Sequence, residues 1–133
     1  MTNVIGTSPA AVGPGQETFN QLFQDEYDSS PGVFTAQAYD ATAVHLLAQL
    51  RADELTGPAV SEQIREVANP SGEVIQPDSL ADGLEMAENG DEIQYQGASS
   101  TVEFDENGDP VISTFEVFEF NEDGYEVIDE IEI

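Results

Sequence analysis

The residues whose spacing comes closest to that of a ligand set are acidic. Asp105, Asn107 and Asp109 alternate along the chain, and Glu116 follows eleven residues after Asp105, which is close to the ligand spacing of a calcium-binding loop. The sixth position of such a loop needs a glycine for its sharp turn, but Pro110 stands there, and the flanking residues favour strands. The segment therefore predicts a tight turn and no metal site.

Residues suited to nucleophilic or acid–base catalysis are scarce in this sequence. It contains no cysteine, and its one histidine, His45, projects from the polar face of a predicted helix without a second metal ligand at a suitable spacing. No Ser/His/Asp spacing and no glycine-rich phosphate loop is present. Among 28 acidic residues, a pair of carboxylates carries no information about glycoside chemistry. We therefore predict no enzyme, no cofactor and no metal.

Tyr39 and Asp40 are the two candidate ligand-binding residues. Both lie in residues 34–51, a predicted helix that begins just after Pro31-Gly32. On pattern alone, Tyr39 is either a core tyrosine with a partner for its hydroxyl or a contact residue near the helix start. Asp40 lies at the edge of the apolar stripe and either orients a neighbouring loop or touches ligand. The stripe comprises Ala36, Tyr39, Ala43, Leu46, Leu47 and Leu50.

The charge of the chain is extreme for a sequence of 133 residues. Two arginines, Arg51 and Arg65, face 28 acidic residues, so the formal net charge is −26. Treated as a charged sphere, such a chain resists compaction by about 30 kcal/mol at 0.15 M salt and by about half that at 1 M, as upper bounds. The sequence nevertheless has the periodic apolar residues of a folding domain. We expect a protein that works in concentrated salt, with a halophile-type acidic surface.

The same charge excludes several partners. Phosphate backbones and anionic lipids repel an acidic chain, so we predict no nucleic-acid partner and no electrostatic membrane docking.

No apolar run approaches the length of a transmembrane helix. The N-terminal residues lack the basic flank and apolar core of a signal peptide. With no cysteine, no disulfide is possible.

Apolar periodicity predicts that helices come first and strands last. Apolar residues recur at intervals of three and four in four segments bounded by proline or glycine. The predicted helices lie near residues 16–28, 34–51, 58–68 and 79–89. From Ile93 onward, strand character dominates, with a four-residue hairpin loop at residues 121–124. The predicted strand segments are Val102 with Phe104, residues 111–120 and the last residues to Ile133, and Val4-Ile5 is the tail of a further strand.

In this layout, the predicted helices have little β-sheet to pack against. An α/β domain normally alternates strands with helices, so that the strands cover the apolar helix faces. Here the first three helices are followed by strands only near the C-terminal end. We therefore expect the chain to be a piece of something larger, or to complete its core with another chain.

Several motifs, in this order and spacing, resemble the C-terminal part of type I periplasmic binding proteins, in particular the branched-chain amino acid/amide group of ABC-transporter substrate-binding proteins. The resemblance covers nearly the whole chain. The motifs are Pro31-Gly32-Val33-Phe34, Ala38-Tyr39-Asp40-Ala41, Tyr95-Gln96-Gly97-Ala98-Ser99, Phe104-Asp105-Glu106-Asn107-Gly108-Asp109, and residues 115–120 with Asp123-Gly124.

The resemblance implies an α/β chain that forms part of a two-lobed fold. Residues 1–116 would belong to the first ligand-binding lobe, and residues 117–133 would form a hinge crossing and the C-terminal hairpin strand of the second lobe. Tyr39 would line the cleft between the lobes, and Asp40 stays the second candidate for ligand contact.

The function implied is extracellular or cell-surface capture of a small polar solute, an amino acid or amide, by lobe closure, with delivery to an ABC permease. The alternative, from the residues alone, is a stand-alone acidic domain that pairs with another protein through uncovered helix faces.

Overall fold

The computed structural model describes residues 4–122 and 124–133 of the chain. The long helices come before most of the strands, as the sequence predicts, and their bounds differ from the predicted ones by at most one residue. The described helices are α1 (Gln16–Tyr27), α2 (Thr35–Arg51), α3 (Gly57–Ala68), the short 3₁₀ helix η1 (Pro77–Ser79) and α4 (Leu80–Asn89). The described strands are β1 (Ile5–Pro9), β2 (Glu73–Ile75), β3 (Ile93–Tyr95), β4 (Thr114–Asn121) and β5 (Gly124–Glu132).

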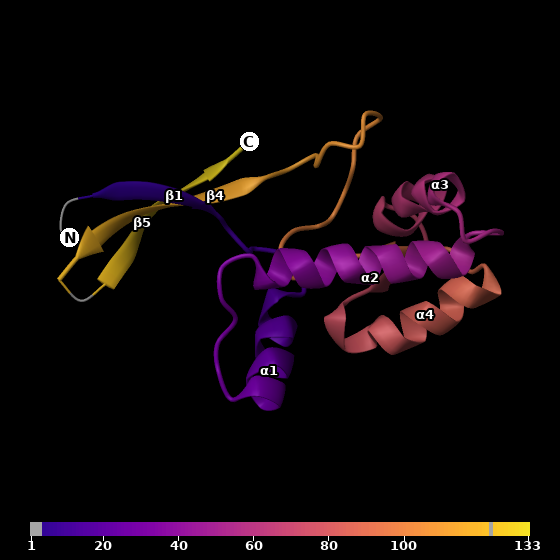
Figure 1. Ribbon diagram of the computed structural model, residues 1–133, viewed down its shortest axis with the longest axis horizontal. Helices are drawn as coiled ribbons and strands as arrows, with labels where there is room; N and C mark the ends of the chain where they lie inside the picture. The colour runs from indigo at the N-terminus through magenta and orange to yellow at the C-terminus, as the bar shows by residue number, and fades with distance from the viewer. Residues whose placement is uncertain (1–3, 123) are drawn as a thin grey trace.

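The molecule consists of a helical body and an arm that projects from it (Figure 1). The arm is the antiparallel sheet β1-β4-β5, in which β4 lies between the other two strands. Asn121 pairs with Gly124 at the tip, which fits the predicted hairpin loop, although Asp123 lies outside the described residues. A β-bulge near Val117 and Phe118 shifts the register of β4 on β5. The body comprises α1–α4 with β2 and β3.

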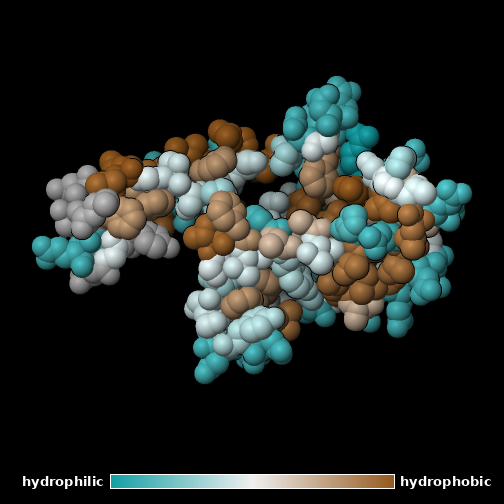
Figure 2. Space-filling view, viewed as in Figure 1, coloured by the Kyte–Doolittle hydropathy of each residue, from teal (hydrophilic) through white to brown (hydrophobic). Residues whose placement is uncertain are grey.

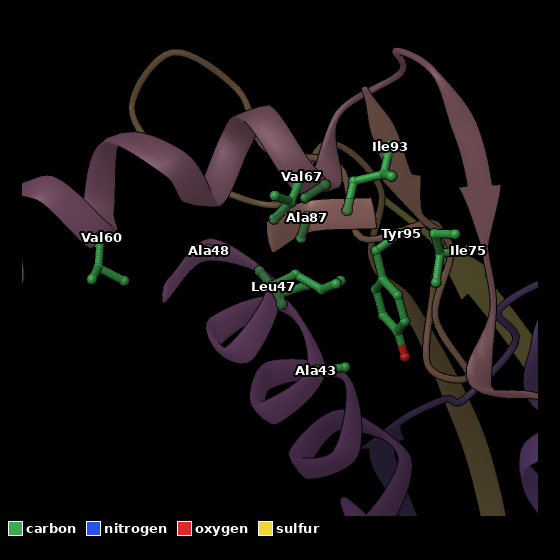
Figure 3. Close-up of a cluster of buried hydrophobic side chains, with 11 residues drawn as sticks. Ala43, Leu47, Ala48, Val60, Val67, Ile75, Ala87, Ile93 and Tyr95 are labelled. Atoms are coloured by element: carbon green, nitrogen blue, oxygen red, sulfur yellow. The ribbon is translucent and has the colours of Figure 1, made fainter. Parts of the chain in front are cut away.

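The core of the body lies where α2, α3 and α4 meet a two-stranded parallel sheet. β2 and β3 pair through Ile75 and Tyr95, and α4 forms the crossover between them. Figure 3 shows Leu47 pointing from α2 towards these strands, where the ring of Tyr95 lies beside Ile75. The fully buried side chains with the largest volumes are Tyr95, Leu47, Ile75, Ile93 and Val67. The helices therefore have a small sheet of their own.

The buried stripe of α2 is rotated from the predicted one. Ala36, Ala43 and Leu47 are buried as expected, but Leu46 and Leu50 are each 41% exposed. The buried positions on the other side of the stripe are Asp40, Val44 and Ala48. The buried face is set by α3 and α4, which both pack on α2. One of its positions is occupied by the polar Asp40, which a hydrophobicity pattern does not predict to be buried.

Two strand predictions differ from the structure. β2 was not predicted, and it supplies the partner for the strand expected at Ile93. Conversely, the segment expected to be a strand at Val102 and Phe104 forms only an isolated bridge, from Phe104 to Pro110. The left-handed backbone of Val102 interrupts the extended conformation there. The strand expected from residue 111 begins at Thr114.

Apolar surface remains uncovered on both parts of the molecule. Figure 2 shows hydrophobic colour along the arm and over the helical body, interrupted by hydrophilic residues. On the arm, Val127, Ile128 and Ile131 are exposed, and on the body Leu55 is 81% exposed. Within the described residues, the parallel sheet has two strands, whereas parallel sheets are normally larger and covered on both faces. The expectation that these elements pack against further β-structure stays a prediction.

Candidate functional site

Asp40 is a buried carboxylate at the junction of three segments. It lies one turn into α2 and is 3% exposed. Its Oδ1 accepts hydrogen bonds from the Tyr95 hydroxyl and the Ala98 N–H, both at 2.9 Å. Its Oδ2 accepts a 2.7 Å bond from the Ser99 N–H and a further bond from the Ser99 hydroxyl. Four donors satisfy the charge, as burial requires.

The loop that Asp40 holds is itself paired with the chain leaving the arm. The Val12, Gly13 and Gly15 N–H groups donate to the carbonyls of Ser99, Ala98 and Gly97, at 2.9–3.0 Å. The contact is too close for side chains, because a Cβ on Gly13 would overlap the Gly97 carbonyl and one on Gly97 would overlap the Asp40 carboxylate. Asp40 therefore orients the loop at residues 97–100, and through it the segment that joins β1 to α1. The loop-orienting interpretation of Asp40 matches this geometry.

Tyr39 packs between α1 and the start of η1. Its ring centroid lies 5.0 Å from that of Phe19, and its hydroxyl donates a 3.4 Å hydrogen bond to the Pro77 carbonyl. Burial raises the pKa of Tyr39, and the nearby charges of Asp40 and Asp78 raise it further. The side chain is half-buried. It thus has the packed ring and partnered hydroxyl of a core tyrosine, and ligand contact by Tyr39 and Asp40 stays a prediction.

A pocket of about 270 Å³ lies at the base of the arm, between the arm and the body. Its walls come from β1, β4, α1, the loop before α2 and the first turn of α2. The lining residues with polar or aromatic side chains include Ser8, Gln16, Asn20, Phe34, Gln37 and Glu116. Neither Tyr39 nor Asp40 lines this pocket, although both belong to the helix whose first turn does.

Phe34, one of the residues that line this pocket, has an unusual backbone conformation. It caps the start of α2 in the left-handed region, with φ of 65°, and its side chain is 57% exposed. A non-glycine residue in this region is held against a local energy cost, and such residues concentrate at binding sites. The sequence marked Phe34 as a helix boundary through Pro31-Gly32, but no sequence signal gave its left-handed backbone.

The acidic segment at residues 105–109 forms a turn held by its own side chains. The Asp105 carboxylate accepts hydrogen bonds from the N–H groups of Asn107 and Asp109, at 2.8 and 2.9 Å, and these bonds lower its pKa. His45 is exposed, with its Nε2 2.9 Å from Nε2 of Gln49. In the part of the chain that the structure describes, no group of three or more His, Cys, Asp or Glu residues is arranged to hold a metal ion.

Comparisons with known proteins bear on the fold. No protein-family model matches the chain, and no curated protein matches its sequence. Among solved structures, the chain is similar to a leucine-binding protein, LivK, from Thermotoga maritima MSB8, with 22% identity and a TM-score of 0.63. The similarity covers 98% of this chain. The chain has the fold of part of a type I periplasmic binding protein.

The match covers nearly all of this chain but less than a third of the neighbour. The chain spans 31% of the length of that leucine-binding protein, so about two thirds of the neighbour has no counterpart in it. The neighbour is a leucine-binding protein. None of the described helices is both long enough and apolar enough to cross a bilayer.

Proposed function

We propose that this chain is a solute-binding module, the C-terminal third of an extracellular receptor that captures a small polar solute, an amino acid or amide, for an ABC transporter. The observation that carries the proposal is the fold match to a leucine-binding protein over 98% of the chain. In the proposed arrangement, residues 1–116 belong to the first lobe. Residues 117–133 form the hinge crossing and the hairpin of the second lobe.

The arm supports a hinge role. β1 and β4 are the two passages of the chain between the body and the arm, and they pair antiparallel from Ile5–Glu119 to Pro9–Phe115. A hinge built from two paired strands lets lobes rotate while the strands stay bonded. The bulge at Val117 and Phe118 lies in the proposed crossing, and bulges increase local twist and bending.

The pocket at the base of the arm supports the location of the solute. All of its lining residues belong to the proposed first lobe, beside the crossing that begins at Val117, so closure of the second lobe would cover a ligand held there. The exposed side chain of Phe34 gives the body side of the pocket an apolar surface. Binding in a two-lobed receptor selects the closed state, because ligand contacts with both lobes exist only there.

The uncovered surfaces support the fragment part of the proposal. The remaining part of the fold would supply further strands beside β2 and β3 and a surface beneath the arm. Exposed apolar residues such as Val74 on β2 and Ile131 on β5 would then become buried. A permease and an ATPase are the partners expected of the complete receptor.

Isothermal titration tests the proposal. We expect the 133-residue chain, or the chain extended upstream by the rest of the fold, to bind at least one solute from a panel of amino acids and amides in 2 M KCl. Phe34→Ala should weaken that binding by about tenfold or more, as loss of a contacting aromatic ring does. The matched control is Leu55→Ala, because Leu55 is more exposed still and lies outside the pocket.

Two results would contradict the proposal. The first is the absence of detectable binding to any amino acid or amide of the panel, in both the 133-residue chain and the extended chain. The second is assembly of the isolated chain with concentration in the absence of solute binding, which would favour the alternative, an acidic protein–protein interaction domain.

A further inference from the structure

Glu116 stands out among the residues that line the pocket at the base of the arm. It is the one ionisable side chain among the lining residues of the described chain, and the others are apolar, amide or hydroxyl side chains. It lies on β4, opposite Ser8 of β1, and is half-buried. A carboxylate in such a pocket attracts a positive charge more strongly than one in open solvent, because water screens it less.

The charge of Glu116 faces a second acid across the sheet. In the antiparallel pairing of β4 with β5, Glu130 stands directly opposite Glu116, so both side chains emerge on the same face. Like charges in this arrangement repel and destabilise the pair. A cation placed between or beside them would relieve that repulsion.

The chain has few cations with which to neutralise this pair. It has no lysine and two arginines. The Arg51 guanidinium donates to the Asp91 carbonyl, and that of Arg65 donates to the carbonyls of Asp105 and Glu106, all within the body. Both arginines are therefore engaged away from the pocket, and its negative charge is left for a ligand.

The other walls of the pocket suit the same kind of ligand. The Gln16 side-chain amide donates to the Ala11 carbonyl and that of Gln37 to the Ala10 carbonyl, so each keeps its amide oxygen as an acceptor. The ring of Phe34 offers an aromatic face, which attracts ammonium and guanidinium groups. The hydroxyls of Ser8 and Ser30 and the amide of Asn20 can donate as well as accept, so the carboxylate of Glu116 and the ring of Phe34 are the features of this pocket that favour a cation.

We infer that the pocket takes a positively charged side-chain group of the solute, a primary ammonium or a guanidinium in addition to any α-ammonium, with Glu116 as its counter-ion and Phe34 as its aromatic wall. This inference rests on the proposed function and narrows its substrate class to cationic amines. Glu116 then determines specificity: it selects solutes with a charged amine at this end over neutral solutes of similar size.

The test is a titration at fixed salt, in whichever form of the protein binds a solute. The probes are L-lysine and L-arginine as cationic solutes, and L-leucine and L-glutamine as solutes with neutral side chains. We expect a cationic probe to bind most tightly, and Glu116→Gln to weaken it by about tenfold while leaving the neutral probes within about twofold.

Glu119→Gln is the matched control. Glu119 lies on the same strand, is also half-buried and also faces an acid across the sheet, Glu126. It is an odd number of residues from Glu116, so it emerges on the opposite face, and it does not line the pocket. We expect this variant to bind the cationic probes like the parent chain. Thermal melts of both variants, monitored by circular dichroism, establish that both are folded.

Three outcomes would overturn the inference. Equal weakening by the two variants would mean that diffuse surface charge attracts the cation. Tighter binding of L-leucine or L-glutamine, unaffected by Glu116→Gln, would overturn the choice of a cationic solute and leave the proposed function standing. If none of the four probes bound detectably, the inference would be overturned together with the proposed function.

Discussion

The Tyr95 hydroxyl donates a hydrogen bond to the Asp40 carboxylate across 2.9 Å, although 55 residues separate the two in the sequence. The bond joins β3 to α2 in the interior of the body, where Tyr95 is fully buried. The same carboxylate holds the Ala98 and Ser99 N–H groups. One side chain of α2 thus fixes the end of β3 and the loop after it, and this loop pairs with the segment that leads out of the arm.

Asp40→Asn should destabilise the fold. Either orientation of the new amide points an N–H₂ group at a backbone N–H that now donates to the carboxylate, so at least one buried donor loses its partner. We expect the free energy of unfolding to fall by about 2–3 kcal/mol, measured by urea denaturation in 2 M KCl.

Ser99→Ala is the control for this substitution. It removes the hydroxyl that donates to Asp40 and keeps both backbone donors, so the loss should be about 1 kcal/mol. Hydrogen exchange should quicken at the Ala98 and Ser99 amides in Asp40→Asn and much less in Ser99→Ala. Equal effects of the two variants on stability and exchange would show that the carboxylate does not hold the loop backbone.

Tyr95 should make the protein sensitive to alkali. Burial raises its pKa above the usual 10.0, and the charge of Asp40 raises it further. The folded state holds the phenolic proton more tightly than the unfolded chain does, so the stabilisation is complete below pH 10 and is lost as the pH rises above it. We expect urea denaturation to show a decline of about 1.4 kcal/mol per pH unit from this group.

The corresponding variants separate this effect from general alkaline denaturation. Tyr95→Phe should lower stability at neutral pH, because Asp40 loses a donor, and should flatten the decline above pH 10. Tyr27→Phe is the matched control, since Tyr27 is 64% exposed, and it should leave the slope unchanged. A slope that Tyr95→Phe does not alter would contradict the prediction.

Gly97 should not tolerate a side chain. A Cβ there would overlap the Asp40 carboxylate, so Gly97→Ala must displace either the loop or α2. We expect a loss of about 2–3 kcal/mol in a urea melt. Gly57→Ala is the control, because a Cβ at Gly57 meets nothing within 4 Å at the start of α3. It should be neutral or slightly stabilising, and a similar loss in both variants would contradict the close approach at Gly97.

The helices could be predicted from sequence because their signals are local. Apolar periodicity and flanking proline or glycine bound each of the four, and their ends fall within one residue of expectation. β2 could not be predicted in this way. Its three residues carry one buried side chain, Ile75, and its partner Tyr95 lies beyond an entire helix. Strands this short are defined by their tertiary partner rather than by their own pattern.

The candidate site was predictable in part. Helical spacing selected Tyr39 and Asp40, and the loop-orienting role of Asp40 was one of two interpretations. The donors that distinguish this role come from Tyr95, Ala98 and Ser99, which no local pattern connects to α2. Phe34 and Glu116 share a pocket only because β4 returns beside the start of α2. Such juxtapositions depend on the fold and not on sequence spacing.

Salt should stabilise the protein strongly. A net charge of −26 opposes compaction, and salt screens that repulsion. We expect the thermal midpoint to rise by at least about 10 °C between 0.1 M and 2 M KCl, which corresponds to a few kcal/mol for a domain of this size. Equal midpoints in the two salts would contradict the interpretation of the acidic surface as an adaptation to concentrated salt.

A single charge on the arm should reproduce a small part of this effect. Glu130→Gln removes the repulsion between Glu130 and Glu116, which stand opposite each other in the sheet. We expect a gain of about 0.5 kcal/mol in the free energy of unfolding at 0.1 M KCl, because like charges across strands destabilise by about this amount. At 2 M KCl the gain should nearly vanish, since the screening length falls to about 3 Å or less. A gain of equal size at both salt concentrations would assign it to strand propensity instead of charge.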